Sequence, residues 1–144
     1  MDTLNDLQVG KVGEHLVCAD LIMKGHIAFS TEQGLSFDVM LVANNKLYKI
    51  QVKTTRQIQA IPQRKLRTDK YIFHIRRCGK GGRRSYLENE VDVFALVALD
   101  TKIIGYMKAK EAKQTMFFSP ENGKQIRKCN IKKLSEYKLE ECLK

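Results

Sequence analysis

Hydrophobic and polar positions change their spacing along the chain, and these changes mark the expected elements. From Leu7 to Lys24 the apolar residues recur with helical spacing, and Gly25 provides a natural end. "HIAFS" then has the pattern of a short strand. "FDVMLVA" and "KLYKIQVKTT" alternate with a period of two, and Asn44-Asn45 between them tolerates the positive φ angles of a tight turn. The pattern predicts a helix, a strand and a β-hairpin.

The second half of the chain predicts further strands. "YIFHIR" reads as a strand, "VFALVALD" is an apolar run suited to a buried strand, and "KIIGYM" returns after a turn at Asp100-Thr101. "YLENEVD" predicts a turn or short helix, with Asp92 as a cap or turn residue, and "NIKKLSEYKLEECLK" predicts a closing helix. This order of elements indicates an α/β or α+β sheet domain.

Composition limits the chain to one domain. Its 144 residues are 43% hydrophobic and 29% charged, which fits a single domain over residues 1–144. No apolar run approaches the roughly 18 residues of a membrane span, and the polar, acidic start "MDTLNDLQ" is unlike a signal peptide. We therefore expect a soluble cytoplasmic protein without a membrane partner. The four cysteines form no C-x-x-C pair and suggest neither a zinc site nor a disulfide framework.

The charge of the chain favours nucleic acid as its partner. Lysine and arginine outnumber aspartate and glutamate by 26 to 16, giving a formal net charge of +10. The excess clusters in "RQIQAIPQRKLRTDK", "RRCGKGGRR" and "KQIRKCNIKK", which suits phosphate backbones better than a membrane surface. "GKGGRR" lacks the phosphate-binding G-x-x-x-x-G-K-[ST] pattern and is expected to be a flexible basic loop. The predicted nucleic-acid contacts are Lys49, Thr55, Arg56, Arg64, Lys65, Arg67, Lys80, Arg83 and Arg84.

The predicted hairpin gathers a carboxylate, an amide and an ammonium group. With the turn centred on Asn44-Asn45, antiparallel pairing sets Asp38 opposite Gln51, and Lys53 shares their face. An oxygen-rich site with a cation at its edge suits Mg²⁺, which commonly binds through one or two carboxylates, waters and substrate phosphate. Each residue alone has an ordinary surface explanation, so the hypothesis rests on their joint arrangement.

The first helix adds a fourth candidate, Glu14 in "GKVGEHL". Gly10 and Gly13 precede it, and both lack the side chain that would hinder close packing of the helix on the sheet. His15, His26 and His74 share no spacing, which favours surface or packing roles over metal ligation.

Glu14 in "GKVGEHL", Asp38 in "SFDVML" and Gln51-Val52-Lys53 in "KIQVKTT" resemble, in order and spacing, the motif of the PD-(D/E)xK nuclease superfamily. The resemblance spans roughly Leu7 to Met107. It is closest to small group I intron-type homing endonucleases with a Q-x-K motif, and similarity to archaeal Holliday junction resolvases is also visible. It implies a restriction-endonuclease-like α/β core, with a central mixed β-sheet flanked by helices and an extra β-hairpin. Phe37 and Gln51 depart from the proline and the acid of the superfamily's name.

The resemblance also implies roles for the motif residues in the metal-dependent hydrolysis of DNA phosphodiesters. Asp38 would bind metal, Gln51 would occupy the second-acid position, and Lys53 would be the catalytic lysine. Glu14 would bind metal directly or through water, and the Val52 backbone carbonyl is a further candidate ligand. The metal would be Mg²⁺, with Mn²⁺ able to substitute, and the substrate would be double-stranded or branched DNA.

Three functions stay open at this point. Site-specific duplex cleavage of the homing type is the first, Holliday junction resolution is the second, and a non-catalytic nucleic-acid-binding module that retains the fold is the third. Two cuts in a duplex need two sites, so a homo-oligomer, either a dimer or a tetramer, is expected.

Overall fold

A computed structural model describes residues 4–59, 69–75, 77–79, 82–84, 89–121 and 132–144, with the backbone alone described at 77–79 and 82–84. The predicted nucleic-acid contacts Arg64, Lys65, Arg67 and Lys80 lie outside these ranges. The elements are α1 (Asp6–Met23), β1 (Ile27–Ser30), β2 (Val39–Ala43), β3 (Lys46–Thr55), β4 (Tyr71–His74), β5 (Arg77–Gly79), β6 (Gly82–Arg84), β7 (Val93–Ala98), β8 (Ile103–Lys108), η1 (Ala109–Glu111), β9 (Thr115–Phe118), η2 (Leu134–Glu136) and α2 (Leu139–Cys142).

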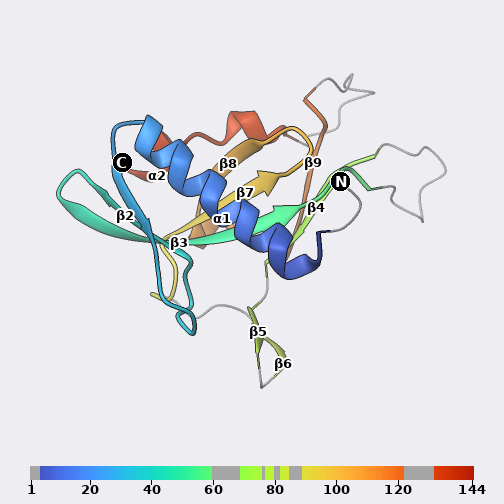
Figure 1. Ribbon diagram of the computed structural model, residues 1–144. Coiled ribbons are helices and arrows are strands. Elements are labelled where there is room, and N and C mark those ends of the chain that lie inside the picture. Colours follow the sequence, from blue (N-terminus) through green and yellow to red (C-terminus); the bar gives the residue numbers. More distant parts are fainter. Residues whose placement is uncertain (1–3, 60–68, 76, 80–81, 85–88, 122–131) are drawn as a thin grey trace.

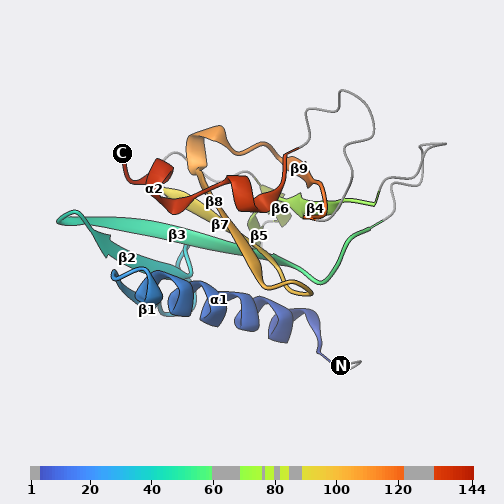
Figure 2. The same cartoon turned by 90° about the horizontal axis from the view of Figure 1, so that it is seen from above.

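A five-stranded sheet in the order β1-β2-β3-β7-β8 forms the centre of the molecule. The strands β3 and β7 run parallel, and the other neighbours in this sheet are antiparallel. Helix α1 crosses one face of the sheet (Figure 1), whereas the paired strands β4 and β9 lie on the other side (Figure 2). The fold is thus the predicted α/β arrangement with a central mixed sheet. None of the helices within the described ranges is long and apolar enough to span a membrane.

The β2–β3 hairpin has the predicted register. Asn44 and Asn45 form its turn with φ angles of 51° and 60°, a conformation that asparagine tolerates better than most residues. Val39 pairs with Ile50, and Met40 pairs with Lys49. The side chains of β3 therefore alternate between the two faces of the sheet as the sequence pattern requires.

Two hydrophobic cores hold the layers together. One lies between α1 and the sheet and includes Val17 and Leu21 from the helix. The other lies between the sheet and the β4–β9 pair and includes Phe73 and Phe118. All six residues of β7 are buried, since alternate side chains enter the two cores, which explains why this strand is an unbroken apolar run.

Helix α1 begins and packs as its sequence dictates. Asn5 and Gln8 form a capping box that satisfies free backbone N–H groups at its start. Gly13 faces Thr54 of β3 so closely that an added Cβ would lie 1.8 Å from the threonine Oγ1. The same test at Gly10 meets no atom within 4 Å, so the predicted role in close packing holds for Gly13 and is wrong for Gly10.

The prediction of a continuous closing helix is wrong. Over its described part, residues 132–144, the chain forms only η2 and the four-residue α2. Between them Tyr137 is extended, because its carbonyl accepts a hydrogen bond of 2.9 Å from the backbone N–H of Tyr106 in β8. The chain also approaches β8 closely here, since an added Cβ at Gly105 would lie 2.9 Å from the Leu134 carbonyl oxygen.

Two further differences concern strands. The basic segment expected to be a flexible loop contains the antiparallel strands β5 and β6, which project away from the central sheet (Figure 1). Strand β9 was not predicted, and it pairs with β4 along its whole length, from Tyr71 opposite Phe118 to His74 opposite Thr115.

Candidate active site

The candidate site lies where β2 and β3 separate. The paired part of β2 begins at Val39, and Asp38 immediately precedes it. The Asp38 backbone N–H donates to the Ile50 carbonyl at 2.8 Å, while its Oδ2 accepts the backbone N–H of Val52 at 2.9 Å. The carboxylate therefore satisfies the N–H of a residue beyond the last β2–β3 pair.

Several charges surround Asp38. Burial raises the pKa of the half-buried carboxyl, the hydrogen bond from Val52 lowers it, and the charge of Glu14 raises it again. Lys53 and Lys11 lower the pKa by smaller amounts. The fold thus brings the predicted Glu14 and Lys53 within electrostatic reach of Asp38, although they come from α1 and β3.

Lys11 is a site residue that the sequence analysis missed. Its Nζ lies 2.9 Å from Glu14 Oε2, and the side chains are 53% and 17% exposed, respectively. The hydrogen bond and charge of Glu14 raise the pKa of Lys11, with Asp38 adding a smaller effect in the same direction. The i,i+3 spacing within "GKVGEHL" was the available signal. Lys11 therefore provides a positive charge for the carboxylate pair.

Gln51 and Val52, which follow the last β2–β3 pair along β3, each carry a neutral oxygen atom. Gln51 is half-buried and lies one position beyond the Val39–Ile50 pair. The N–H and C=O of one strand residue point to the same side, so the Val52 carbonyl leaves β3 on the side of Asp38.

This donor set suits a hard divalent cation. No group of three or more His, Cys, Asp or Glu side chains with metal-binding geometry occurs among the described residues. Mg²⁺, however, often uses only one or two carboxylates and completes its shell with neutral oxygens and water. Glu14, Asp38, the Gln51 amide and the Val52 carbonyl are the oxygen donors that could meet this requirement, and Asp38 commits only Oδ2 to a described hydrogen bond.

A groove of about 630 Å³ adjoins Lys53. Its walls come from the first half of α1, the end of β3 and strand β4, with His74 at the end of β4. Thr54 contributes to the groove, and its buried Oγ1 has no hydrogen-bond partner among the described atoms. The groove gives a substrate room next to the predicted catalytic lysine.

The predicted nucleic-acid contacts within the described ranges lie in β3, directly after it and in β6. Thr55 is buried and lines the groove. Arg56 also lines it, but its guanidinium pairs with Asp6 at 3.0 Å and donates to the Leu4 carbonyl at 2.7 Å. The Lys49 ammonium donates to the Asn89 carbonyl. Arg83 and Arg84 lie in β6, whose backbone alone is described.

Comparison with known proteins gives two findings. The family profile described as PD-(D/E)XK endonuclease matches residues 4–140. Among solved structures, the bacterial homing endonuclease I-Ssp6803I is similar, with a TM-score of 0.68 and 16% sequence identity. The similarity covers 88% of this chain and 86% of that one. No curated protein sequence matches the chain.

Proposed function

The chain belongs to the PD-(D/E)XK endonuclease family, and we propose that it is a metal-dependent endodeoxyribonuclease that cleaves duplex DNA at specific sites. The observation that supports this proposal most is that Glu14 and Lys53 lie within electrostatic reach of Asp38, at the point where β2 and β3 separate. The similarity to a homing endonuclease supports the homing type of cleavage, through the shared fold alone.

The proposed metal ligands are Asp38, the side-chain oxygen of Gln51, the Val52 carbonyl and Glu14. A divalent cation held by these residues would supply Lewis acidity, which lowers the pKa of a water molecule and neutralises negative charge on a phosphate. Mg²⁺ fits the oxygen donors, and Mn²⁺ accepts the same ligand types.

The chain's own residues prepare the site for in-line hydrolysis. The Val52 N–H fixes the orientation of the Asp38 carboxylate, so little side-chain freedom remains to be lost when substrate binds. The Lys53 ammonium is proposed to orient the water or to donate hydrogen bonds to the phosphoryl oxygens, where negative charge accumulates. Glu14 is held in an ion pair with Lys11 and would give up that pair to hold a divalent cation.

DNA binding is proposed to depend mainly on the basic segments. The net charge of +10 supports a polyanionic substrate. If Arg83 and Arg84 contact backbone phosphates, changing both to alanine should reduce the slope of log affinity against log salt by roughly 0.9 per lost contact on duplex DNA. An unchanged slope would show that β6 faces away from the substrate.

The direct test compares cleavage with binding. Asp38→Ala and Lys53→Ala are expected to abolish cleavage of supercoiled plasmid while retaining most of the DNA affinity. The exposed residues Glu140 and Lys113 provide matched alanine controls, which remove one charge of each sign at positions that do not line the groove beside Lys53. Activity that survives in the Asp38→Ala/Lys53→Ala double variant would refute the assignment.

The same assay separates the other functions. Parallel reactions on duplex plasmid and on a synthetic four-way junction, with and without Mg²⁺ or Mn²⁺, are required. Cleavage of the junction alone would support a Holliday junction resolvase. Binding without cleavage under every condition would support a non-catalytic module.

Oligomerisation completes the proposal. A double-strand break needs two catalytic sites, and a closed symmetric dimer or tetramer supplies them. Light scattering of the protein with and without DNA would test this point, and a monomer that still linearises plasmid in one binding event would contradict it.

A further inference from the structure

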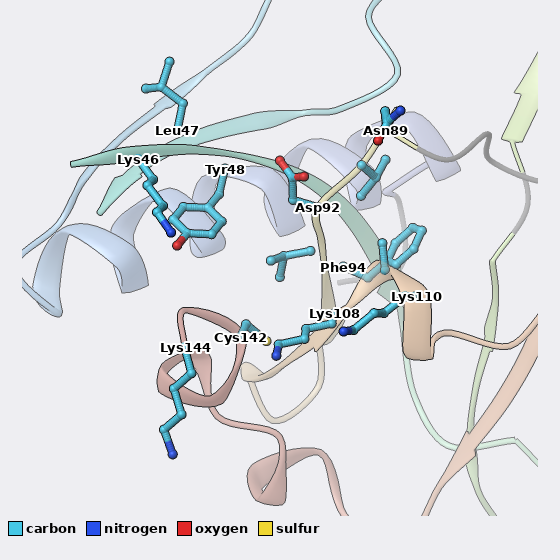
Figure 3. Close-up of a pocket in the computed structure, with 13 residues that line it drawn as sticks. Lys46, Leu47, Tyr48, Asn89, Asp92, Phe94, Lys108, Lys110, Cys142 and Lys144 are labelled. Carbon is cyan, nitrogen blue, oxygen red and sulfur yellow. The ribbon is translucent and has the colours of Figure 1, made fainter. Parts of the chain in front are cut away.

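A second pocket, of about 750 Å³, lies at the end of the sheet where β3 begins. Figure 3 shows its walls, which come from the first residues of β3, the start of β7, the end of β8 with η1, and the end of α2 with Lys144. Its volume falls within the range of small-molecule sites. None of the residues assigned to the proposed cleavage site lines this pocket.

Four lysines dominate the charge of this pocket: Lys46, Lys108, Lys110 and Lys144. Lys144 pairs with Glu141 at 3.0 Å. The ammonium groups of the other three make no hydrogen bond or ion pair with any described residue. Ammonium groups gathered without carboxylate partners repel one another, and an anionic ligand would relieve that repulsion.

The carboxylate and the thiol in the wall of the pocket do not oppose the binding of an anion. Asp92 is the only carboxylate side chain among the lining residues, and its Oδ2 already accepts the backbone N–H of Lys49 at 2.8 Å. Burial raises the pKa of the Cys142 thiol to about 11, so it is protonated and uncharged at neutral pH. The charges of Glu111, Glu140 and Glu141 also reach Cys142 and add to the rise of its pKa, but none of these carboxylates lines the pocket. The lysines that line the pocket therefore favour an anionic ligand.

Strand register explains why the charges converge. Val93 of β7 pairs with Ile50 on one side and with Lys108 on the other, so Lys108 stands beside Val93 on one face of the sheet. Lys46 and Tyr48 are on the same face, since they precede Ile50 by even numbers of residues. An apolar floor flanked by an aromatic ring and ammonium groups is a suitable place for a nucleotide.

We propose that this pocket is a second phosphate-binding site, which takes either a free nucleotide or a backbone phosphate of DNA outside the cleavage site. Lys46 lies five residues before Gln51 along β3, or about 17 Å at the usual rise of a strand. A phosphate held here is therefore separate from the one being hydrolysed. Binding of a free nucleotide is independent of the proposed nuclease function, whereas binding of a DNA backbone phosphate rests on it.

The test measures binding without metal, so a failure of cleavage does not affect it. Thymidine 5′-monophosphate and thymidine are titrated into the protein by calorimetry, and affinity for a duplex oligonucleotide is measured over a range of salt concentrations. The pocket variant is Lys108→Ala/Lys110→Ala. The matched control is Lys113→Ala/Lys138→Ala, which removes the same charge from exposed lysines outside the pocket. Lys108→Arg/Lys110→Arg preserves the charge.

For a free nucleotide, we expect the monophosphate but not thymidine to bind, with affinity at least about tenfold weaker in the alanine variant and retained in the arginine variant. For a DNA phosphate, we expect a salt slope shallower by roughly 0.9 per lost contact in the alanine variant alone. Either result supports the site and identifies its source. The proposal is overturned if neither effect occurs, or if the control pair produces the same loss, since the lysines would then act only through net charge. Thermal unfolding of each variant verifies that it is folded.

Discussion

Replacing Gly13 by alanine tests the contact that seats α1 on β3. In an open helix position the change from glycine to alanine stabilises by about 1 kcal/mol, through lower backbone entropy in the unfolded chain. At Gly13 the new Cβ would lie 1.8 Å from Thr54 Oγ1 and 3.0 Å from Thr54 Cβ, so the helix or the strand must move. Overpacking of this kind costs about 1–3 kcal/mol, and sometimes more. The net expectation is a loss of about 0–2 kcal/mol in the free energy of unfolding.

Gly10 is the matched control, because it lies in the same helix and an added Cβ there meets nothing within 4 Å. Gly10→Ala should therefore stabilise by about 1 kcal/mol, leaving the two alanine variants separated by about 1–3 kcal/mol in urea denaturation. Thr54→Ala combined with Gly13→Ala should recover part of the loss, because it removes the Oγ1 at the closest approach. The reasoning fails if Gly13→Ala is as stable as Gly10→Ala. Cleavage should also fall in Gly13→Ala, since Glu14 is the next residue.

Three further predictions concern the carboxylate site. Because the pKa of Asp38 is raised in the folded state, stability should fall as the pH rises through the raised pKa. Asp38→Asn, which keeps an acceptor for the Val52 N–H, should therefore have a higher free energy of unfolding than the wild type at neutral pH in urea denaturation, and equal stabilities of the two proteins across the pH range would contradict the raised pKa. Lys11→Met should strengthen Mg²⁺ binding about two- to fivefold in calorimetry, because it removes the cation paired with Glu14; weaker binding would assign Lys11 a supporting role. For Gln51, metal affinity should rank Glu above Gln above Ala, and identical affinities would show that this side chain points away from the metal.

Local patterns predicted the elements that depend on neighbouring residues. The asparagine turn fixed the β2–β3 register, and with it the relation of Asp38 to Gln51, because side-chain direction in a strand has a strict period of two. The end of α1 likewise follows from Gly25, whose φ of 88° is accessible to glycine at little cost.

Long-range contacts explain what the sequence did not predict. The C-terminal segment has a helical pattern. The Tyr137 carbonyl, however, accepts a hydrogen bond from the backbone N–H of Tyr106 in β8, more than 30 residues earlier, and the helix is interrupted there. Residues Thr115–Phe118 form strand β9 by pairing with β4, and no local sequence pattern predicts this pairing. The lysine pocket was missed for the same reason, because Lys46, Lys108 and Lys144 belong to separate segments that only the folded sheet brings together.

The parallel pairing of β3 with β7 has a consequence for how the chain can change during evolution. Two parallel strands cannot be joined by a tight turn, so the connection between Thr55 and Val93 must be long. The β5–β6 hairpin projects from this connection (Figure 1). The entropy of closing such a connection grows slowly, by about 0.6 kcal/mol for each doubling of its length. Insertions and charge changes in the projecting hairpin therefore cost the fold little, and Asp38 and Lys53 lie outside it. Related proteins could therefore acquire new binding partners through changes in this connection, while the residues of the proposed cleavage site stay the same.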